Sequence, residues 1–172
     1  MDKLMTLFIV EDEISSEDSW RLLEWCHRVG AEEFSLEILE RQDEGEERAR
    51  AIDQALAVFE REPAPREGVM ARQGEAWVRA IPLWVLTPAS IRQLQQLLPD
   101  GLFTYGVWTE PAWCENLRLY RNGAPMLGIV THESMGTLHV TPSEREALEE
   151  MDIRYHLELP FYVRTDETDD HA

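Results

Sequence analysis

The sequence predicts one α+β domain over residues 1–172, in which a β-α-β-α segment precedes a mostly antiparallel sheet with two hairpins and short helices. Three observations support this prediction. Strand and helix patterns alternate in the first part of the chain, and an Asn-Gly pair separates two later strand patterns. A length of 172 residues with 44% hydrophobic content is also enough to fill one core.

The N-terminal half begins with a strand pattern from Lys3 to Val10, which is almost continuously apolar and therefore predicts a strand covered on both faces. Ser15 or Ser16 can cap the helix that follows, and Gly30 can end it. The inward side of this helix is an apolar stripe made of Leu22, Leu23, Cys26 and Val29.

A second strand and a second helix complete this half. From Phe34 to Leu39 the residues alternate, with Phe34, Leu36 and Ile38 on one face and Ser35 and Glu37 on the other. From Glu44 to Phe59 the apolar residues recur at helical spacing, which predicts a helix. Residues 60–69 contain two prolines and a glycine, so they are interpreted as an exposed loop or linker.

The centre of the chain is strand-like as far as Leu86, although Pro82 has no N–H to donate and so indicates an edge or a bulge. Thr87 is a candidate N-cap with Pro88 at the first helical position. The buried side of that helix is predicted to be Ile91, Leu94, Leu97 and Leu98. A strand from Leu102 to Trp108 and an aromatic loop, WTEPAWCEN, are expected next.

The C-terminal half is predicted to contain two hairpins. Asn122-Gly123 indicates a two-residue turn in the first. A three-residue turn at Ser134, Met135 and Gly136 is expected in the second, with Val130 opposite Val140 and His132 opposite Leu138. In that register one side of the sheet carries Leu117, Leu119, Met126, Val130, Leu138 and Val140.

The last segment begins with a capping box from Thr141 to Glu144, which predicts a short helix to Met151. A final strand is expected from Tyr155 to Val163, because apolar and polar residues alternate there. Residues 164–172 form a polar, acidic tail that should be loose.

The net charge of −18, from 34 acidic and 16 basic residues, is the strongest global signal. A field of this sign repels nucleic acid and anionic lipid, so neither is predicted as a partner, and it favours encounter with a basic protein. No apolar run is long enough to span a bilayer, which predicts a cytoplasmic protein. The two cysteines, Cys26 and Cys114, are expected to be reduced and packed.

The leading functional hypothesis is a small acidic binding module that masks a basic surface on a protein partner, as an immunity protein, an inhibitor or an adaptor does. Charges would speed the encounter while buried aromatic residues supply most of the affinity. No catalytic residue, metal or cofactor is predicted. The predicted contact residues are Glu11, Asp12, Glu13, Glu17, Asp18, Glu44, Glu46 and Glu47, with Trp108 and Trp113 as anchors.

Two short segments have a resemblance to known families. LFIVEDEISSEDSW, from Leu7 to Trp20, places Glu11, Asp12 and Glu13 between an apolar run and a helix-like segment. This order resembles the start of a response-regulator receiver domain, whose acidic residues at the end of the first strand hold a divalent cation beside a phosphorylated aspartate. The later acceptor and lysine are not recognisable, since Asp53 lies in a helical pattern and Lys3, the only lysine, precedes the strand. THESMG, around Ser134, resembles the nucleophile elbow of serine hydrolases, but a strand pattern follows it where that family has a helix.

Two other interpretations of the chain remain open at this point. His132, His139 and His156, with the carboxylates of Glu133 and Glu158, could form a metal site or a catalytic site on adjacent strands if the hairpin register brought them together. Alternatively, the acidity serves only solubility or adaptation to salt, in which case acidic residues should be spread evenly over the surface.

Overall fold

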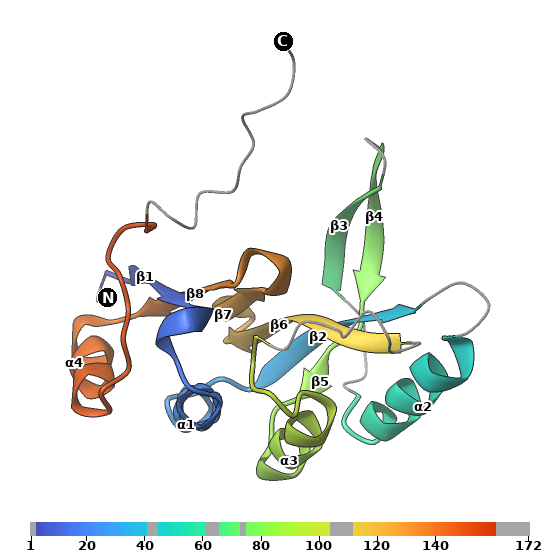
Figure 1. Ribbon diagram of the computed structural model, residues 1–172, viewed down its shortest axis with the longest axis horizontal. Coiled ribbons are helices and arrows are strands. Elements are labelled where there is room, and N and C mark those ends of the chain that lie inside the picture. Colours follow the sequence, from blue (N-terminus) through green and yellow to red (C-terminus); the bar gives the residue numbers. More distant parts are fainter. Residues whose placement is uncertain (1–2, 41–44, 61–65, 73–74, 104–111, 161–172) are drawn as a thin grey trace.

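The computed structural model describes residues 3–40, 45–60, 66–72, 75–103 and 112–160 (Figure 1). The helices are α1 (Ser16–Arg28), α2 (Glu46–Ala57), α3 (Pro88–Leu97) and α4 (Pro142–Glu150), with the 3-10 turns η1 (Glu11–Glu13) and η2 (Thr131–Glu133). The strands are β1 (Met5–Val10), β2 (Glu33–Glu40), β3 (Arg66–Arg72), β4 (Glu75–Ile81), β5 (Trp84–Val85), β6 (Ala112–Arg121), β7 (Ala124–Val130) and β8 (Met135–Val140).

The architecture is α+β, as the sequence predicts. Six strands form an antiparallel sheet in the order β1-β8-β7-β6-β2-β5, and β3 pairs with β4 in a separate hairpin. Figure 1 shows the four helices side by side along one side of the large sheet, while the β3–β4 hairpin projects from the other side. Within the described ranges, no helix is long and apolar enough to cross a bilayer.

A row of six apolar side chains crosses the whole sheet. Each member lies directly opposite the next in the strand register, and every member is at most 3% exposed. At the β2–β5 end the rings of Phe34 and Trp84 lie 5.4 Å apart and are tilted by 30°. In the order of the strands, this cross-sheet row consists of Leu7, Leu138, Leu127, Leu119, Phe34 and Trp84.

The helices cover the cross-sheet row with apolar faces that the sequence largely predicts. α1 buries Leu22, Leu23 and Cys26 as expected and also Trp25, while α3 buries Ile91 and Leu94. The predicted caps are confirmed, because Ser15 caps α1 and capping boxes at Thr87 and Thr141 open α3 and α4.

Cys26 and Cys114 are both free and buried, and burial raises the pKa of the Cys114 thiol to about 12.

The first predicted hairpin is confirmed in detail. Arg121 pairs with Ala124, so Asn122 and Gly123 alone form the loop between β6 and β7. Both loop residues have positive φ, 49° for Asn122 and 76° for Gly123, which a two-residue turn compatible with the strand twist requires. Asparagine and glycine tolerate this conformation better than other residues do.

The predicted register of the second hairpin is wrong. Val130 pairs with Met135 rather than with Val140, and His132 lies in η2 rather than opposite Leu138. The connection is therefore four residues long, and its last residue, Ser134, has a φ of 51°. This register differs from the predicted one by an odd number of residues, and an odd shift turns the side chains of β7 to the opposite face of the sheet. Leu127, rather than Met126, therefore lies on the same face as Leu138.

Hydrogen bonds to β6 explain this longer turn. The backbone N–H of Thr131 donates to Asn116 Oδ1 over 3.0 Å, and the backbone N–H of Asn116 donates to Thr131 Oγ1 over 2.9 Å. The two residues satisfy each other's backbone groups, which ends β7 at Val130. Side-chain contacts of this kind leave no trace in the apolar periodicity of the sequence.

Three smaller differences separate the predicted elements from the observed ones. Pro82 interrupts the central strand, so that β4 and β5 belong to different sheets. Residues 66–69 lie in β3 rather than in a loop. Leu102 and Phe103 form a turn instead of beginning a strand, since the N–H of Leu102 donates to Ser19 Oγ on α1. The rest of that predicted strand lies outside the described residues.

In the described part of the expected final strand, residues 155–160, the only pairing is a single bridge between His156 and Phe8, at the edge of β1. A bend at residues 157 and 158 follows it, and Leu157 is 58% exposed rather than packed on the core. Residues 161–163 and the predicted acidic tail, 164–172, lie outside the described part of the chain.

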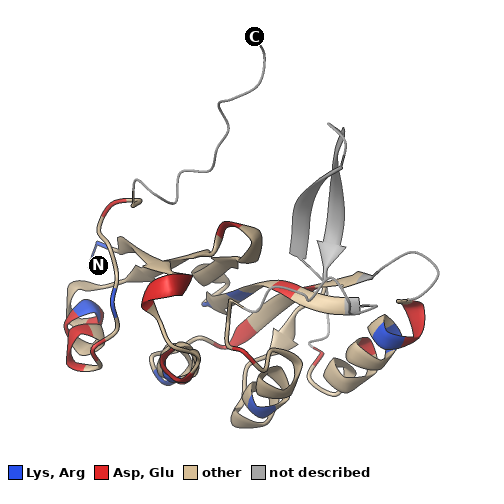
Figure 2. Cartoon of the chain, in the orientation of Figure 1, with Lys and Arg blue, Asp and Glu red and all other residues tan. Residues whose placement is uncertain are grey.

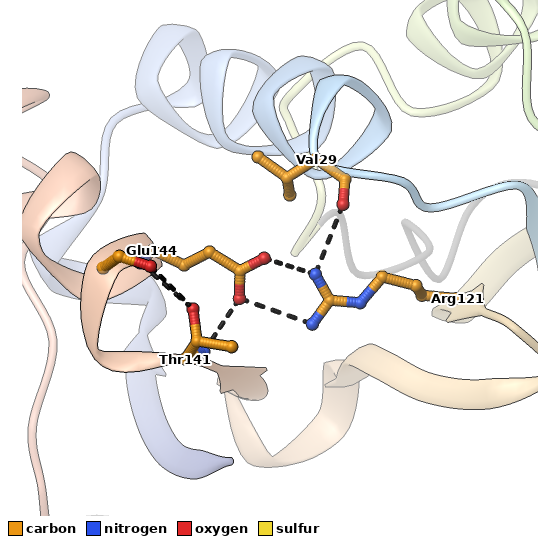
Figure 3. A network of polar contacts seen from close by, with 5 residues as sticks. Val29, Arg121, Thr141 and Glu144 are labelled. Carbon is orange, nitrogen blue, oxygen red and sulfur yellow. Dashed lines mark hydrogen bonds and ion pairs between the residues drawn. The ribbon is translucent and has the colours of Figure 1, made fainter. Parts of the chain in front are cut away.

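A polar network joins the ends of three elements (Figure 3). Arg121, at the end of β6, forms an ion pair with Glu144 in α4 and donates to the carbonyl of Val29 at the end of α1. Glu144 also accepts a hydrogen bond of 2.8 Å from the N–H of Thr141. Burial alone would raise the pKa of Glu144, but the hydrogen bonds from Arg121 and Thr141 outweigh it and lower that pKa below 4.5.

Shortening a member of the cross-sheet row should destabilise the fold strongly. We expect Leu127→Ala to lower the free energy of unfolding by about 2–5 kcal/mol, because it leaves a cavity at a fully buried position. Leu4→Ala is the matched control, since Leu4 is 52% exposed and should cost less than about 1 kcal/mol. Urea denaturation of both variants measures the difference, and equal losses would show that the row is not the centre of the core.

The stabilisation from Glu144 should depend on pH. A carboxyl group whose pKa is lowered on folding stabilises the protein above its unfolded pKa, and the effect disappears as pH falls through the folded pKa. We therefore expect Glu144→Gln to lower the free energy of unfolding at pH 7 by on the order of 1–3 kcal/mol. This difference from the wild type should shrink below pH 4.5. Denaturation across pH measures it, with Glu150→Gln as the exposed control, and a pH-independent difference would contradict the assignment.

Candidate functional site

The N-terminal acidic cluster, defined as Glu11, Asp12, Glu13, Glu17 and Asp18, begins where β1 ends. η1 follows Val10 directly and places three consecutive carboxylates in one tight turn. The N–H of Glu11 donates to the carbonyl of Ser134 over 2.9 Å, and the N–H of Ile14 donates to the carbonyl of Glu11 over 3.2 Å. The turn is thus fixed to the β7–β8 connection, and Figure 2 shows it as a red segment between β1 and α1.

Two members of this cluster are engaged in internal interactions. Asp18 accepts hydrogen bonds from Ser15 Oγ over 2.7 Å and from Arg21 Nη1 over 2.6 Å, and these two donors lower its pKa. Glu13 Oε2 lies 2.7 Å from Nε2 of His156. That contact, together with the backbone pairing of His156 and Phe8, holds the segment after α4 against β1.

The other three members remain available on the surface. Asp12 and Glu17 are exposed and Glu11 is half-buried. Within the described ranges none of these three side chains forms an ion pair or a hydrogen bond. The carboxylate of Glu17 also lies in the first turn of α1, where the helix dipole favours negative charge. The cluster therefore combines a rigid backbone with three unpaired carboxylates.

The second group of predicted acidic contacts lies elsewhere. Glu46 and Glu47 are exposed in the first turn of α2, and Arg50 forms an ion pair with Glu46 at 2.6 Å. Glu44 lies outside the described residues. Figures 1 and 2 place the start of α2 at the opposite end of the long axis from β1 and α4, well away from η1. The structure thus separates the predicted acidic residues into two surfaces.

The predicted aromatic anchors do not form a loop within the described residues. Trp108 lies outside them. Trp113 belongs to β6, where it pairs with Leu39, and its side chain is half-buried. Its Nε1–H donates to Glu115 Oε1 over 2.5 Å, so the polar atom of the indole already has a partner inside the sheet.

A polar cluster that sequence reasoning missed lies on β2 and β6. Glu37 and Glu115 are directly opposite each other, and Glu115 is only 7% exposed. Glu37 accepts a hydrogen bond of 3.0 Å from Asn116 Nδ2 and lies 3.6 Å from Arg118 Nη2. The alternation of apolar and polar residues along β2 predicts that Glu37 lies on the opposite face of the sheet from Phe34. The irregular register at Asn116, where φ is 54°, has no equivalent sequence signal.

The three candidate histidines occupy different places. His132 is exposed in η2, and His139 lies on β8 with Nδ1 3.2 Å from Thr6 Oγ1. His156 contacts Glu13 instead. In the part of the chain that the structure describes, no group of three or more His, Cys, Asp or Glu side chains could hold a metal ion. The observed hairpin register therefore does not bring these histidines together into a metal site.

Comparison with known protein families, with curated proteins and with solved structures finds no match to this chain. The candidate site is consequently defined by its own geometry. Its most coherent part is the N-terminal acidic cluster at the end of β1.

Proposed function

We propose that this protein binds a basic protein partner through the N-terminal acidic cluster and so masks a positively charged surface, in the manner of an immunity protein, an inhibitor or an adaptor. The single observation that supports this proposal most is the group of unpaired carboxylates at Glu11, Asp12 and Glu17, which η1 and α1 hold on a fixed backbone. Because the backbone is already fixed, these carboxylates lose only side-chain freedom when they meet a partner.

The net charge of −18 adds a longer-range contribution. It attracts a basic protein from the surrounding solution and raises the association rate, although salt screens the field beyond about 8 Å at physiological ionic strength. Carboxylates at the contact then select the partner and its orientation. Binding by this mechanism should weaken as the salt concentration rises.

The acidic residues that already have internal partners have a different role. Asp18 and Glu13 stabilise the start of α1 and the segment around His156. Their removal would disturb the turn that presents the other carboxylates. A test of binding should therefore neutralise only the three unpaired residues.

Neutralising Glu11, Asp12 and Glu17 together should weaken binding of the basic partner by about tenfold at low salt, if each carboxylate contributes roughly 0.5 kcal/mol. The partner would be captured from host lysate with the wild-type protein and identified by mass spectrometry. After purification, its affinity for the wild type and for the Glu11→Gln, Asp12→Asn, Glu17→Gln variant would be measured at two salt concentrations.

A matched control variant separates local contacts from net charge. Glu146, Glu150 and Asp152 are exposed on and after α4, so Glu146→Gln, Glu150→Gln and Asp152→Asn together remove the same charge elsewhere. This control should keep most of the affinity. Equal losses in both variants would show that only net charge acts, and failure to capture any salt-sensitive basic protein would reject the proposal.

A further inference from the structure

A pocket of about 320 Å³ lies at the β5 end of the sheet, beside the last turns of α2. Its volume is within the range of small binding sites in proteins. Neither the predicted contacts nor the N-terminal acidic cluster includes any part of it. The described residues that line this α2–β5 pocket are Asp53, Gln54, Ala57, Glu60, Pro82 and Trp84.

The walls of the pocket are held by backbone interactions. Glu60 forms a bridge with Trp84, and the N–H of Val85 donates to the carbonyl of Phe59 over 2.7 Å. Trp84 is also the last member of the cross-sheet row, where its ring packs on Phe34. The segment that follows α2 and the edge of the sheet are thus fixed to each other.

The lining combines negative charge with apolar surface. Asp53 and Glu60 are exposed, and in the described part of the chain neither carboxylate forms an ion pair or a side-chain hydrogen bond. Gln54 adds a side-chain carbonyl that can accept hydrogen bonds. Ala57, Pro82 and Trp84 supply apolar contacts, and no lysine or arginine occurs among the described lining residues.

We propose that the α2–β5 pocket receives an arginine side chain of the basic partner, an inference that rests on the proposed function and adds a contact on the acidic surface at α2, outside the N-terminal acidic cluster. A guanidinium group has five N–H donors in one plane, which suits two carboxylates and an amide carbonyl better than the compact ammonium group of lysine does. The methylene groups of arginine suit the apolar part of the wall, to which Ala57 and Pro82 contribute, whereas Trp84 is only 3% exposed and closes the base of the pocket.

The position of the pocket extends the predicted contact surface. Glu46 and Glu47 begin the same helix that carries Asp53 and Gln54. Arg50 pairs with Glu46, so the carboxylate that the start of α2 adds without an ion pair in the described residues is that of Glu47. A partner that places arginine in the pocket would therefore meet additional negative charge nearby. The pocket supplies selectivity for one side chain, while the surrounding charge supplies general attraction.

The experiment is a titration of the ¹⁵N-labelled protein with N-acetyl-arginine amide, followed by NMR. We expect saturable shifts at the backbone amides of residues 53–57 and at the indole N–H of Trp84. N-acetyl-citrulline amide, which keeps the planar group but carries no charge, should cause shifts at least tenfold smaller at the same concentration. Shifts that are absent with the arginine compound, or equal with both compounds, would overturn the proposal.

Two variants test the location of binding. Ala57→Leu fills the pocket without changing charge, and Asp53→Asn with Glu60→Gln removes both carboxylates. Each variant should weaken the affinity for N-acetyl-arginine amide at least tenfold. Glu24→Gln with Asp100→Asn removes the same charge at exposed positions outside the pocket and should bind as the wild type does. Unchanged binding in Ala57→Leu, or equal weakening in the control, would exclude the pocket as the site.

The same Ala57→Leu variant distinguishes failure of this inference from failure of the proposed function. If the purified partner binds the wild type and Ala57→Leu equally, the pocket is not used and only the inference fails. If no basic partner exists but N-acetyl-arginine amide still binds in the pocket, the proposed function fails while the site for a guanidinium group remains.

Discussion

The cross-sheet row is the interaction on which the rest of this structure depends. Burying each of its large apolar side chains contributes about 1.5–3 kcal/mol, and the row also fixes the strand register, because a slip of one residue would turn every side chain of a strand to the other face. The helices then pack on that face. The same register places the carbonyl of Ser134 beside the N–H of Glu11, which fixes the turn that presents the acidic cluster.

Local sequence signals are sufficient to predict most helices and strands. They do not predict how strands that are distant along the chain pair with one another. Ser15, Thr87 and Thr141 act through hydrogen bonds within three residues, so their caps are visible in the sequence. The register of β7 and β8 was mispredicted because β7 is apolar on both faces and alternation cannot choose between them. Its turn depends on Asn116 and Thr131, which lie far apart along the chain.

The candidate site was predictable to a similar degree. Composition identified the acidic residues at the end of β1 but could not show that Asp18 and Glu13 would be occupied by Arg21 and His156. It also could not show that the α2 carboxylates would form a separate surface (Figure 2). The paired carboxylates hold the backbone of this region, whereas those of Asp12 and Glu17 are exposed on the surface.

The most direct test of this account is an NMR measurement of methyl NOEs between β6, β7 and β8 in the folded protein. The cross-sheet row predicts NOEs from the methyl groups of Leu127 to those of both Leu138 and Leu119. An NOE between Val130 and Val140, without one between Leu127 and Leu138, would show that the hairpin has the register predicted from the sequence. That result would contradict the cross-sheet row. In that case the hydrogen bond between the N–H of Glu11 and the carbonyl of Ser134 would not form, and the proposed position of the N-terminal acidic cluster would be wrong.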